Sequence, residues 1–246
     1  MLRTLIGTEL WIDQTESQAF NLDTILLANF VKIPYRTKKI LDIGTGAGGL
    51  MLYLSQKTKA QIIGIEIQES RVQQAQKNIE INHLENQLSC VFSDVKNIKY
   101  KDVDYIVSNP PFFKVNEESN LSLIEEDQIA RHEITLNLED LIQTASSFLK
   151  NGGYFAMIHR PDRFEEILRL MAKYHMTIKR IRFVHPYIDK KANHLLIEAM
   201  KLGKPGLTVE HPLILYHDKH IMTKELIKLY GGEKDVIITT QQKRKT

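Results

Sequence analysis

Short apolar runs alternate with helical patterns between residues 39 and 108, and this alternation limits the chain to few folds. Four runs fit buried strands, at residues 39–43, 61–67, 87–92 and 103–107. Between them, residues 50–56 fit a helix, and Val72, Ala75 and Ile79 recur at helical spacing. Strands that alternate with helices are typical of a parallel sheet with helices on both faces, so we predict a doubly wound α/β fold.

The rest of the chain supplies three more predicted strands and further helices. The strands lie at residues 154–158, 177–184 and 194–200, and the last two read as a pair. Helices are predicted at residues 21–31, at 138–149 with a stop at Gly152-Gly153, and at 162–174 after Pro161. The predicted sheet therefore has seven mostly parallel strands.

The ends of the chain differ in character from this core. Residues 2–12 fit a short hairpin, and the last residues are basic and polar. We expect an N-terminal extension at residues 1–35, made of the hairpin and a helix and packed on the core. The main domain would cover residues 36–235, and a basic tail would follow at 236–246.

Composition excludes several classes of protein. The 246 residues carry 33 Lys and Arg against 30 Asp and Glu, a net charge of +3 that is too small to indicate nucleic-acid binding. A single cysteine, Cys90, cannot form an internal disulfide, and His217 and His220 lack the further ligands of a zinc site, so no metal is expected. The sequence has no run of about 18 apolar residues and no signal-peptide pattern, so we expect a cytoplasmic protein without a membrane segment.

A glycine-rich turn follows the first predicted strand, with the sequence Asp42-Ile43-Gly44-Thr45-Gly46-Ala47-Gly48. Glycines allow a sharp turn and let the backbone approach a ligand closely. The nicotinamide pattern has its third glycine two residues later, and a P-loop needs Gly-Lys-Ser/Thr, which is absent. The spacing instead resembles the first motif of class I S-adenosylmethionine-dependent methyltransferases, with an ordinary tight turn as the alternative.

Glu66 ends the second predicted strand, where this fold places an acid that binds the two ribose hydroxyls of a nucleoside cofactor. A carboxylate accepts hydrogen bonds from both hydroxyls and repels a 2'-phosphate. The methyltransferase resemblance implies that the neighbouring Ile67 also contacts the cofactor. It further implies that Asp94, after the third strand, binds the adenine amino group, although a turn aspartate would also fit there.

The sequence Asn109-Pro110-Pro111-Phe112 directly follows the fourth predicted strand and opens a long polar loop. Carboxyl ends of parallel strands face the ligand crevice, so this loop is expected beside the cofactor. An amine conjugated to a ring is a poor nucleophile. If the Asn109 side-chain oxygen and the Pro110 carbonyl each accept one N–H, the nitrogen is aligned and its developing charge stabilised. The prolines stiffen the loop, and Phe112 offers a face for stacking.

The wider chain resembles the bacterial tRNA adenine-N6 methyltransferases that act on adenine 37 of valine tRNA. Besides the motifs above, the segments that carry the likeness are Phe20-Asn21-Leu22-Asp23, Leu26-Leu27-Ala28, Ala130-Arg131-His132-Glu133, Arg160-Pro161, Arg182-Phe183-Val184-His185-Pro186, Ala192-Asn193 and Leu196-Ile197-Glu198. The likeness covers nearly all of the chain except the two termini. Phe112 stands where tyrosine is common, a change that keeps stacking and loses one hydroxyl.

This resemblance implies a Rossmann-like class I methyltransferase that uses S-adenosylmethionine and binds the anticodon loop of a tRNA, as a monomer or weak dimer. The implied cofactor contacts are Asp42, Gly44, Thr45, Gly46, Gly48, Glu66, Ile67, Asp94 and Asn109, and the implied catalytic residues are Asn109, Pro110, Pro111 and Phe112.

Basic residues in or near segments after the strands could neutralise RNA phosphates. They are Lys114, Arg131, Arg160, Arg163, Arg180, Arg182, Lys190 and Lys191. We assign Lys114, Arg131, Arg160 and Arg182 to RNA binding, while any of these residues could equally belong to an ordinary solvated surface.

Three enzyme classes with similar motifs, and one class without catalysis, remain as alternatives. Protein glutamine methyltransferases carry a helical domain before the glycine motif, guanine-N2 ribosomal RNA methyltransferases are longer, and DNA adenine methyltransferases add a recognition domain. A non-catalytic RNA-binding relative would not need Asp42, Glu66 and Asn109 intact. Binding of S-adenosylmethionine distinguishes the enzymes from that module.

Overall fold

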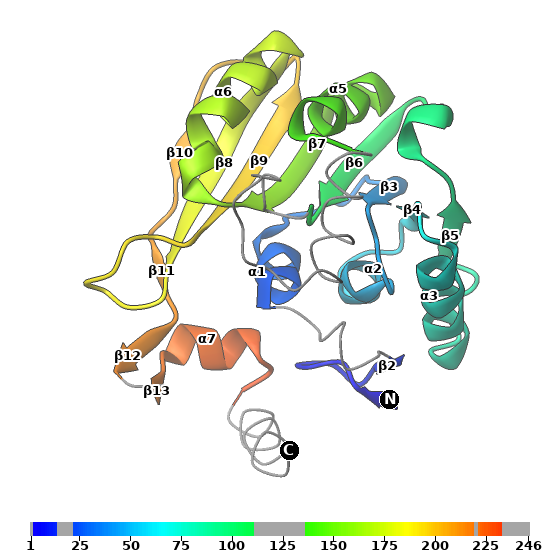
Figure 1. The fold of residues 1–246 in the computed structure, drawn as a ribbon, viewed down its shortest axis with the longest axis horizontal. Helices are drawn as coiled ribbons and strands as arrows, with labels where there is room; N and C mark the ends of the chain where they lie inside the picture. The colour runs from blue at the N-terminus through cyan, green and yellow to red at the C-terminus, as the bar shows by residue number, and fades with distance from the viewer. Residues whose placement is uncertain (1, 14–21, 111–135, 219–220, 233–246) are drawn as a thin grey trace, which may run out of the picture.

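The computed structural model describes residues 2–13, 22–110, 136–218 and 221–232. One large mixed sheet forms its centre, and its strands lie in the order β10-β8-β9-β7-β6-β3-β4-β5, with β11 also paired to β8 (Figure 1). The strands are β3 (Lys39–Ile43), β4 (Gln61–Glu66), β5 (Leu88–Phe92), β6 (Val103–Ser108), β7 (Leu149–His159), β8 (Met176–His185), β9 (His194–Lys201), β10 (Thr208–Val209) and β11 (Leu213–Ile214).

The predicted mostly parallel α/β fold is confirmed, and the number of strands is larger than predicted. Strands β5, β4, β3, β6 and β7 pair in parallel, and β9 pairs antiparallel with both β7 and β8. The sheet has nine strands and not seven, because two-residue strands β10 and β11 extend it along the edge of β8. Runs this short carry no periodicity that a sequence could show.

Helices cover the two faces of the sheet with two separate apolar clusters. One cluster contains side chains of α1 (Leu22–Phe30), α2 (Gly49–Ser55) and α3 (Glu69–Ile81), and α7 (Lys224–Leu229) adds Leu226. The other contains side chains of α5 (Leu138–Phe148) and α6 (Phe164–Lys173). Burial of both strand faces explains why these strands read as continuous apolar runs.

Two predicted element boundaries were wrong. Residues Gly152-Gly153 do not end the preceding helix, because β7 already begins at Leu149 and passes through them, with Gly152 at a φ of +78°. Pro161 begins a short 3-10 helix, Pro161–Arg163, and α6 starts only at Phe164.

The N-terminal hairpin consists of β1 (Leu2–Thr4) and β2 (Trp11–Asp13) and packs against α3. Asn82 Oδ1 accepts the Trp11 N–H at 2.8 Å, and Asn78 Oδ1 accepts the Asp13 N–H at 2.7 Å. Leu5 and Ile12 belong to the same apolar cluster as α1 and α2. A second hairpin, β12 (Tyr216–Asp218) with β13 (Ile221–Met222), precedes α7. The division of the chain at residue 35 stays a prediction.

A buried network of charges joins α1 to the sheet. Arg180, 7% exposed, donates to Glu198 at 3.1 Å, to Glu210 at 2.9 Å and to the Phe30 carbonyl at 2.7 Å. The Tyr105 hydroxyl donates to Glu198 as well. The hypothesis that Arg180 faces RNA phosphates was wrong, because its guanidinium is buried and satisfied inside the protein.

Every helix in the described ranges is too short or too polar to cross a lipid bilayer.

Gly64 in β4 lies beneath the glycine turn, and a Cβ there would come within 2.6 Å of Thr45 Cγ2 and 2.7 Å of Met51 Sδ. We expect Gly64→Ala to lower the free energy of unfolding by about 1–3 kcal/mol, because the closely packed turn must shift. Urea unfolding measures this loss. Adding Thr45→Ser removes the nearest methyl group and should restore part of it; no difference between Gly64→Ala and wild type would contradict the packing described.

Candidate active site

Parallel pairing brings the ends of β3, β4 and β6 together at one edge of the sheet. Ile43 is in register with Ile65 on one side and with Ser108 on the other. The Ser108 hydroxyl donates to the Ile43 carbonyl at 2.8 Å, which ties the end of β6 to the start of the glycine turn. The predicted cofactor and catalytic segments therefore meet at this edge, which we call the carboxyl edge.

The glycine turn has the backbone conformation that its sequence predicts. Gly44, Gly46 and Gly48 have φ values of +74°, +57° and +83°, in the region that favours glycine. Gly44 N–H donates to the Ile65 carbonyl at 2.9 Å, and Gly48 is the N-cap of α2. Among the described residues, apart from its two chain neighbours, no atom lies within 4 Å of where a Gly44 Cβ would be.

Asp42 is buried at the end of β3, with 1% of its surface exposed. The Thr45 hydroxyl donates to Asp42 Oδ2 at 2.6 Å. Burial raises the pKa of Asp42 to about 7, the Thr45 hydrogen bond acts to lower it, and the nearby charge of Glu66 raises it further.

Glu66 is 3% exposed and holds the turn through its carboxylate. Oε2 accepts the Gly46 N–H at 2.9 Å, while Oε1 accepts the N–H groups of Ile67 at 2.9 Å and Gln68 at 3.0 Å. A carboxylate offers about four acceptor positions, and backbone N–H groups occupy three of those of Glu66. The carboxylate therefore organises the turn and keeps room for a further donor, such as a ribose hydroxyl.

Asp94 and Ile67 lie at the same edge. The Ser93 N–H donates to the Glu66 carbonyl at 2.9 Å, which places the residue after β5 beside the end of β4. Asp94 Oδ1 accepts the Lys96 N–H at 2.9 Å and begins a short 3-10 helix (Val95–Asn97). The turn role of Asp94 is thus present in the structure, and its contact with adenine stays a prediction.

Asn109 follows β6 directly and contacts the first turn of α1. Its Nδ2 donates to Thr24 Oγ1 at 3.3 Å, and within the described part of the chain its Oδ1 accepts no hydrogen bond. The adjacent Asp23, 4% exposed, pairs with His194 at the start of β9 at 2.8 Å. The sequence pattern gave no role to Asp23, Thr24 or His194, although Asp23 lies in a segment that carries the family likeness.

Several predicted residues lie outside the described ranges or are partly engaged elsewhere. Pro111, Phe112, Lys114 and Arg131 belong to residues 111–135, which the structure does not describe. Arg160 follows β7 at the carboxyl edge, is exposed, and pairs with Asp162 at 3.2 Å. Arg182 donates to the His211 carbonyl at 2.9 Å and pairs with Glu225 at 2.6 Å.

The described residues contain no group of three or more His, Cys, Asp and Glu side chains that could hold a metal ion. His217 is exposed, and His220 lies outside the described residues. The absence of a metal cofactor stays a prediction.

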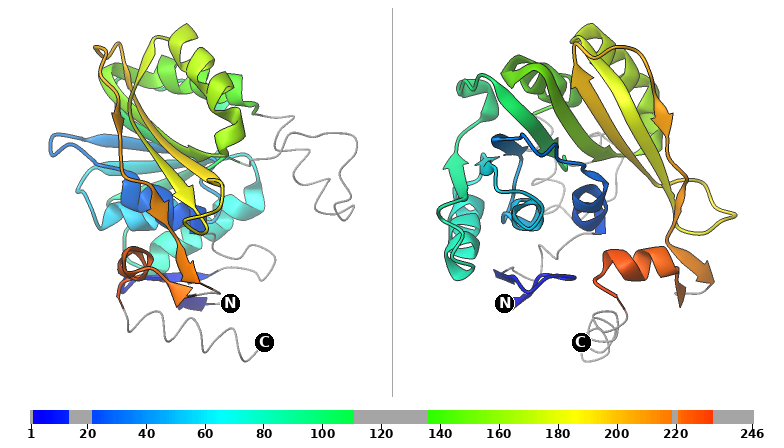
Figure 2. Two further views of the ribbon diagram at one scale, coloured as in Figure 1. Left: turned by 90° about the vertical axis from the view of Figure 1, so that its left-hand side faces the viewer. Right: turned by 180° about the vertical axis from the view of Figure 1, so that it is seen from behind.

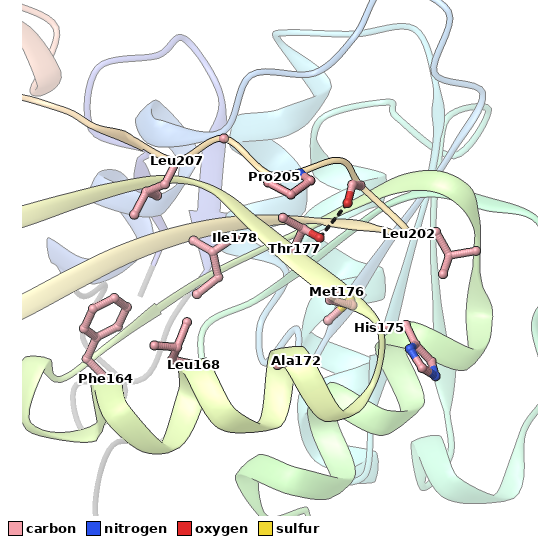
Figure 3. A pocket seen from close by; sticks show the side chains of 12 residues that line it. Phe164, Leu168, Ala172, His175, Met176, Thr177, Ile178, Leu202, Pro205 and Leu207 are labelled. Atoms are coloured by element: carbon pink, nitrogen blue, oxygen red, sulfur yellow. Dashed lines mark hydrogen bonds between the residues drawn. The ribbon is translucent and has the colours of Figure 1, made fainter.

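An apolar pocket lies away from this site, between α6 and the beginning of β8 (Figure 3). Phe164, Leu168, Ile178 and Leu207 line its walls, and the Thr177 hydroxyl donates to the Gly203 carbonyl at 2.7 Å within it. The start of β8 is at the opposite edge of the sheet from Asn109, so this pocket contains none of the predicted site residues.

The carboxyl edge fits the nucleoside cofactor that the sequence implies. With respect to the described residues, the space at Gly44 admits a ligand against the backbone, and Glu66 retains an acceptor position for a hydroxyl. In the same part of the chain, the Asn109 side-chain oxygen accepts no hydrogen bond and lies at the same edge, beyond the turn. The arrangement can hold a nucleoside and position an N–H donor beside it.

Comparison with known proteins agrees with this geometry. The family model of the methyltransferase small domain matches residues 21–184. A tRNA1(Val) (adenine(37)-N6)-methyltransferase from Flavobacterium psychrophilum is 29% identical over 85% of this chain and 89% of its own length. A protein of the same name from Tolumonas auensis is 30% identical, covering 84% of this chain and 86% of its own.

Solved structures share the fold at lower identity. A predicted O-methyltransferase from Agrobacterium tumefaciens superposes with a TM-score of 0.67 at 22% identity, over 86% of this chain and 96% of its own. The geranyl diphosphate C-methyltransferase of Streptomyces coelicolor, solved with S-adenosyl-L-homocysteine, has a TM-score of 0.53 at 14% identity. The match covers 72% of this chain and 76% of that enzyme's chain. These identities support the fold alone.

Asp42 makes the stability of the ligand-free protein depend on pH. The folded protein keeps a proton on Asp42 up to a pKa of about 7, whereas the unfolded chain loses it near 3.8. The unfolded state therefore binds fewer protons in this interval, and the free energy of unfolding falls as pH rises through it. We expect Asp42→Asn, which keeps an oxygen for Thr45, to remove this fall in urea unfolding measured between pH 5 and 8.

Asp94→Asn is the matched control, because Asp94 is a partly exposed carboxylate at the same edge. It removes a carboxylate at the same edge and leaves Asp42 in place, so a loss of the pH dependence in both variants would not be specific to Asp42. If the fall persisted unchanged in Asp42→Asn, a group other than Asp42 would carry it.

Proposed function

Because the chain belongs to the methyltransferase small domain family and to that of the tRNA1(Val) (adenine(37)-N6)-methyltransferases, we propose that it methylates the exocyclic N6 of an adenine in tRNA, adenine 37 of valine tRNA. S-adenosylmethionine is the methyl donor. The observation that supports this reaction is the position of Asn109. It follows β6 directly, beside the glycine turn, and its side-chain oxygen is unused among the described residues.

We propose that Asn109 and Pro110 hold the target amine. The Asn109 Oδ1 and the Pro110 carbonyl would each accept one N–H of the adenine amino group, which aligns the nitrogen lone pair with the methyl group. The bond from Asn109 Nδ2 to Thr24 leaves Oδ1 for the substrate. Two oxygen dipoles then face the positive charge that develops on nitrogen, and the product loses its proton to water.

The remaining motif residues would complete this pocket. Pro111 stiffens the loop after Asn109, so the two acceptors need no reorganisation during transfer. Phe112 would stack on the adenine ring, an interaction worth about 1–3 kcal/mol. Both roles are inferred from the residue types and their position after β6.

The cofactor would lie between the glycine turn and the ends of β4 and β5. When bound, S-adenosylmethionine supplies an electrophilic methyl group on a sulfonium sulfur. We assign the ribose to Glu66, the adenine to Asp94 and Ile67, and the remaining contacts to Asp42, Gly44, Thr45, Gly46, Gly48 and Asn109. The three N–H groups already on Glu66 fix its carboxylate before the cofactor arrives.

RNA binding is assigned first to Arg160, an exposed residue at the carboxyl edge. Lys114 and Arg131 stay proposals from their sequence positions, and Arg182 could offer only the N–H groups that His211 and Glu225 leave unused. An adenine in the anticodon loop is unpaired, which lowers the cost of moving it into a pocket. We propose that the protein acts in the cytoplasm as a monomer or weak dimer.

Incubation with radiolabelled S-adenosylmethionine and tRNA from a host that lacks the modification tests the function. Label in N6-methyladenosine beside the anticodon of valine tRNA is expected. Label in another nucleoside would show that the protein methylates a different RNA position. Label in protein would favour glutamine methylation. RNA binding without cofactor binding would indicate a non-catalytic relative.

Asn109→Ala should reduce methyl transfer at least 100-fold, because the substitution removes the amine acceptor. It should change the dissociation constant for S-adenosylmethionine far less, because Asn109 is one of several cofactor contacts. Single-turnover kinetics and calorimetry measure the two quantities. Asn97→Ala, at an exposed asparagine in a turn, is the matched control. Turnover comparable to wild type in Asn109→Ala would refute the assigned role.

Glu66→Ala should weaken S-adenosylmethionine binding about tenfold or more, because the ribose loses its acceptor and the turn loses three hydrogen bonds. Calorimetry gives the dissociation constant, and urea unfolding shows whether the protein remains folded. Glu69→Ala, on the exposed first turn of α3, should bind as wild type. An unchanged constant in Glu66→Ala would show that the ribose lies elsewhere.

A further inference from the structure

The loop of residues 186–193, between β8 and β9, lies at the carboxyl edge of the sheet. Strand β8 pairs antiparallel with β9, and β9 pairs antiparallel with β7, so β8 runs in the same direction as β7 and β6. The end of β8 therefore points to the edge that carries Asn109 and Arg160. The loop projects beyond that end and away from the sheet (Figures 1 and 2).

Several contacts fix the conformation of this loop. The Lys190 N–H donates to the Tyr187 carbonyl at 3.1 Å, and the His185 ring lies 2.7 Å from the Lys190 carbonyl oxygen. The Tyr216 N–H donates to the Pro186 carbonyl at 2.9 Å, and the Tyr187 and Tyr216 rings pack with centroids 5.7 Å apart. These contacts fix the backbone of the loop, and therefore the positions from which its exposed side chains project.

The exposed side chains of the loop include one large apolar residue and two lysines, together with Asp189 and Asn193. Ile188 is 78% exposed, and Lys190 and Lys191 are exposed beside it. Among the described residues, Lys190 pairs only with Asp189, at 3.4 Å, and the two side chains are 62% and 68% exposed, so this ion pair contributes little. Lys191 has no ion pair within the described residues. No part of the fold described above requires these side chains.

We propose that this loop binds the RNA substrate, with Lys190 and Lys191 on backbone phosphates and Ile188 against a neighbouring ribose or base. Exposed cations on a braced loop suit a polyanion, since binding releases counterions without ordering the loop. This inference rests on the proposed function, because an RNA must reach the carboxyl edge for the loop to meet it.

The position of the loop selects which nucleotides it can touch. Strands β9 and β7 lie between β8 and β6, and neighbouring strands are about 4.8 Å apart, which separates β8 from β6 by roughly 14 Å. Asn109, at the end of β6, would hold the target adenine. The lysines therefore contact nucleotides that flank the target and set affinity for the RNA, with no part in the transfer step.

Lys190→Gln with Lys191→Gln tests this role in the full-length protein. Its matched control is Lys101→Gln with Lys204→Gln, two exposed lysines at the opposite edge, since Lys101 precedes β6 and Lys204 follows β9. Both variants lose two positive charges. The measurements are the dissociation constant for unmodified tRNA at several salt concentrations, kcat at saturating tRNA, and the dissociation constant for S-adenosylmethionine.

We expect the loop variant to bind tRNA about tenfold more weakly at low salt, with a slope of log affinity against log salt reduced by roughly 1.4–1.8. Its kcat and cofactor affinity should match wild type, and the control should keep the wild-type slope. Ile188→Ser should weaken binding without changing the slope. Equal tRNA affinity in the loop variant and the control would overturn the proposal. Failure of wild type to methylate any tRNA would instead refute the proposed function.

Discussion

Parallel pairing of β5, β4, β3, β6 and β7 is the constraint on which the site depends. It brings to one edge the backbone groups that follow each strand, although they are distant in the sequence. The ties between Ser108 and Ile43, and between Ser93 and Glu66, then set the relative positions of these segments. The glycine turn and Asn109 therefore reach their places through the sheet and need few direct contacts with each other.

Two of the buried carboxylates at this edge, Asp42 and Glu66, are satisfied differently by the structure. Glu66 accepts three backbone N–H groups, whereas Asp42 accepts one hydroxyl. Fewer donors leave desolvation of Asp42 uncompensated, so its pKa rises to about 7. In our proposal both groups face a cofactor whose hydroxyls donate hydrogen bonds and whose sulfur is positive. The edge thus carries unfavourable electrostatics that a ligand of that chemistry would relieve.

The sequence could predict what depends on local pattern. Apolar runs located the main strands, and glycine spacing with Glu66 located the turn, because each feature is confined to a few neighbouring residues. Contacts between residues that are distant in the sequence could not be predicted from local patterns. Arg180 has the same sequence character as a surface arginine, and only the fold reveals Glu198 and Glu210 around it. Thr24 contacts Asn109 across 85 residues, a distance over which no local pattern extends.

The lysines that we propose to bind RNA at the 186–193 loop lie apart from the groups that would perform the chemistry. Asn109 and Pro110 are neutral acceptors, and a lysine beside them would compete for the same oxygens and repel the ammonium that forms on the substrate. These lysines follow β8, which is separated from β6 by β9 and β7, whereas Arg160 follows β7, the strand next to β6. Long-range attraction brings a polyanion to the edge from that distance, while the short-range dipoles of Asn109 and Pro110 act only on a nucleotide already in place. In our proposal affinity and turnover are therefore carried by different elements of one sheet, so a change in the β8–β9 loop would alter the strength of RNA binding without altering how the amine is held.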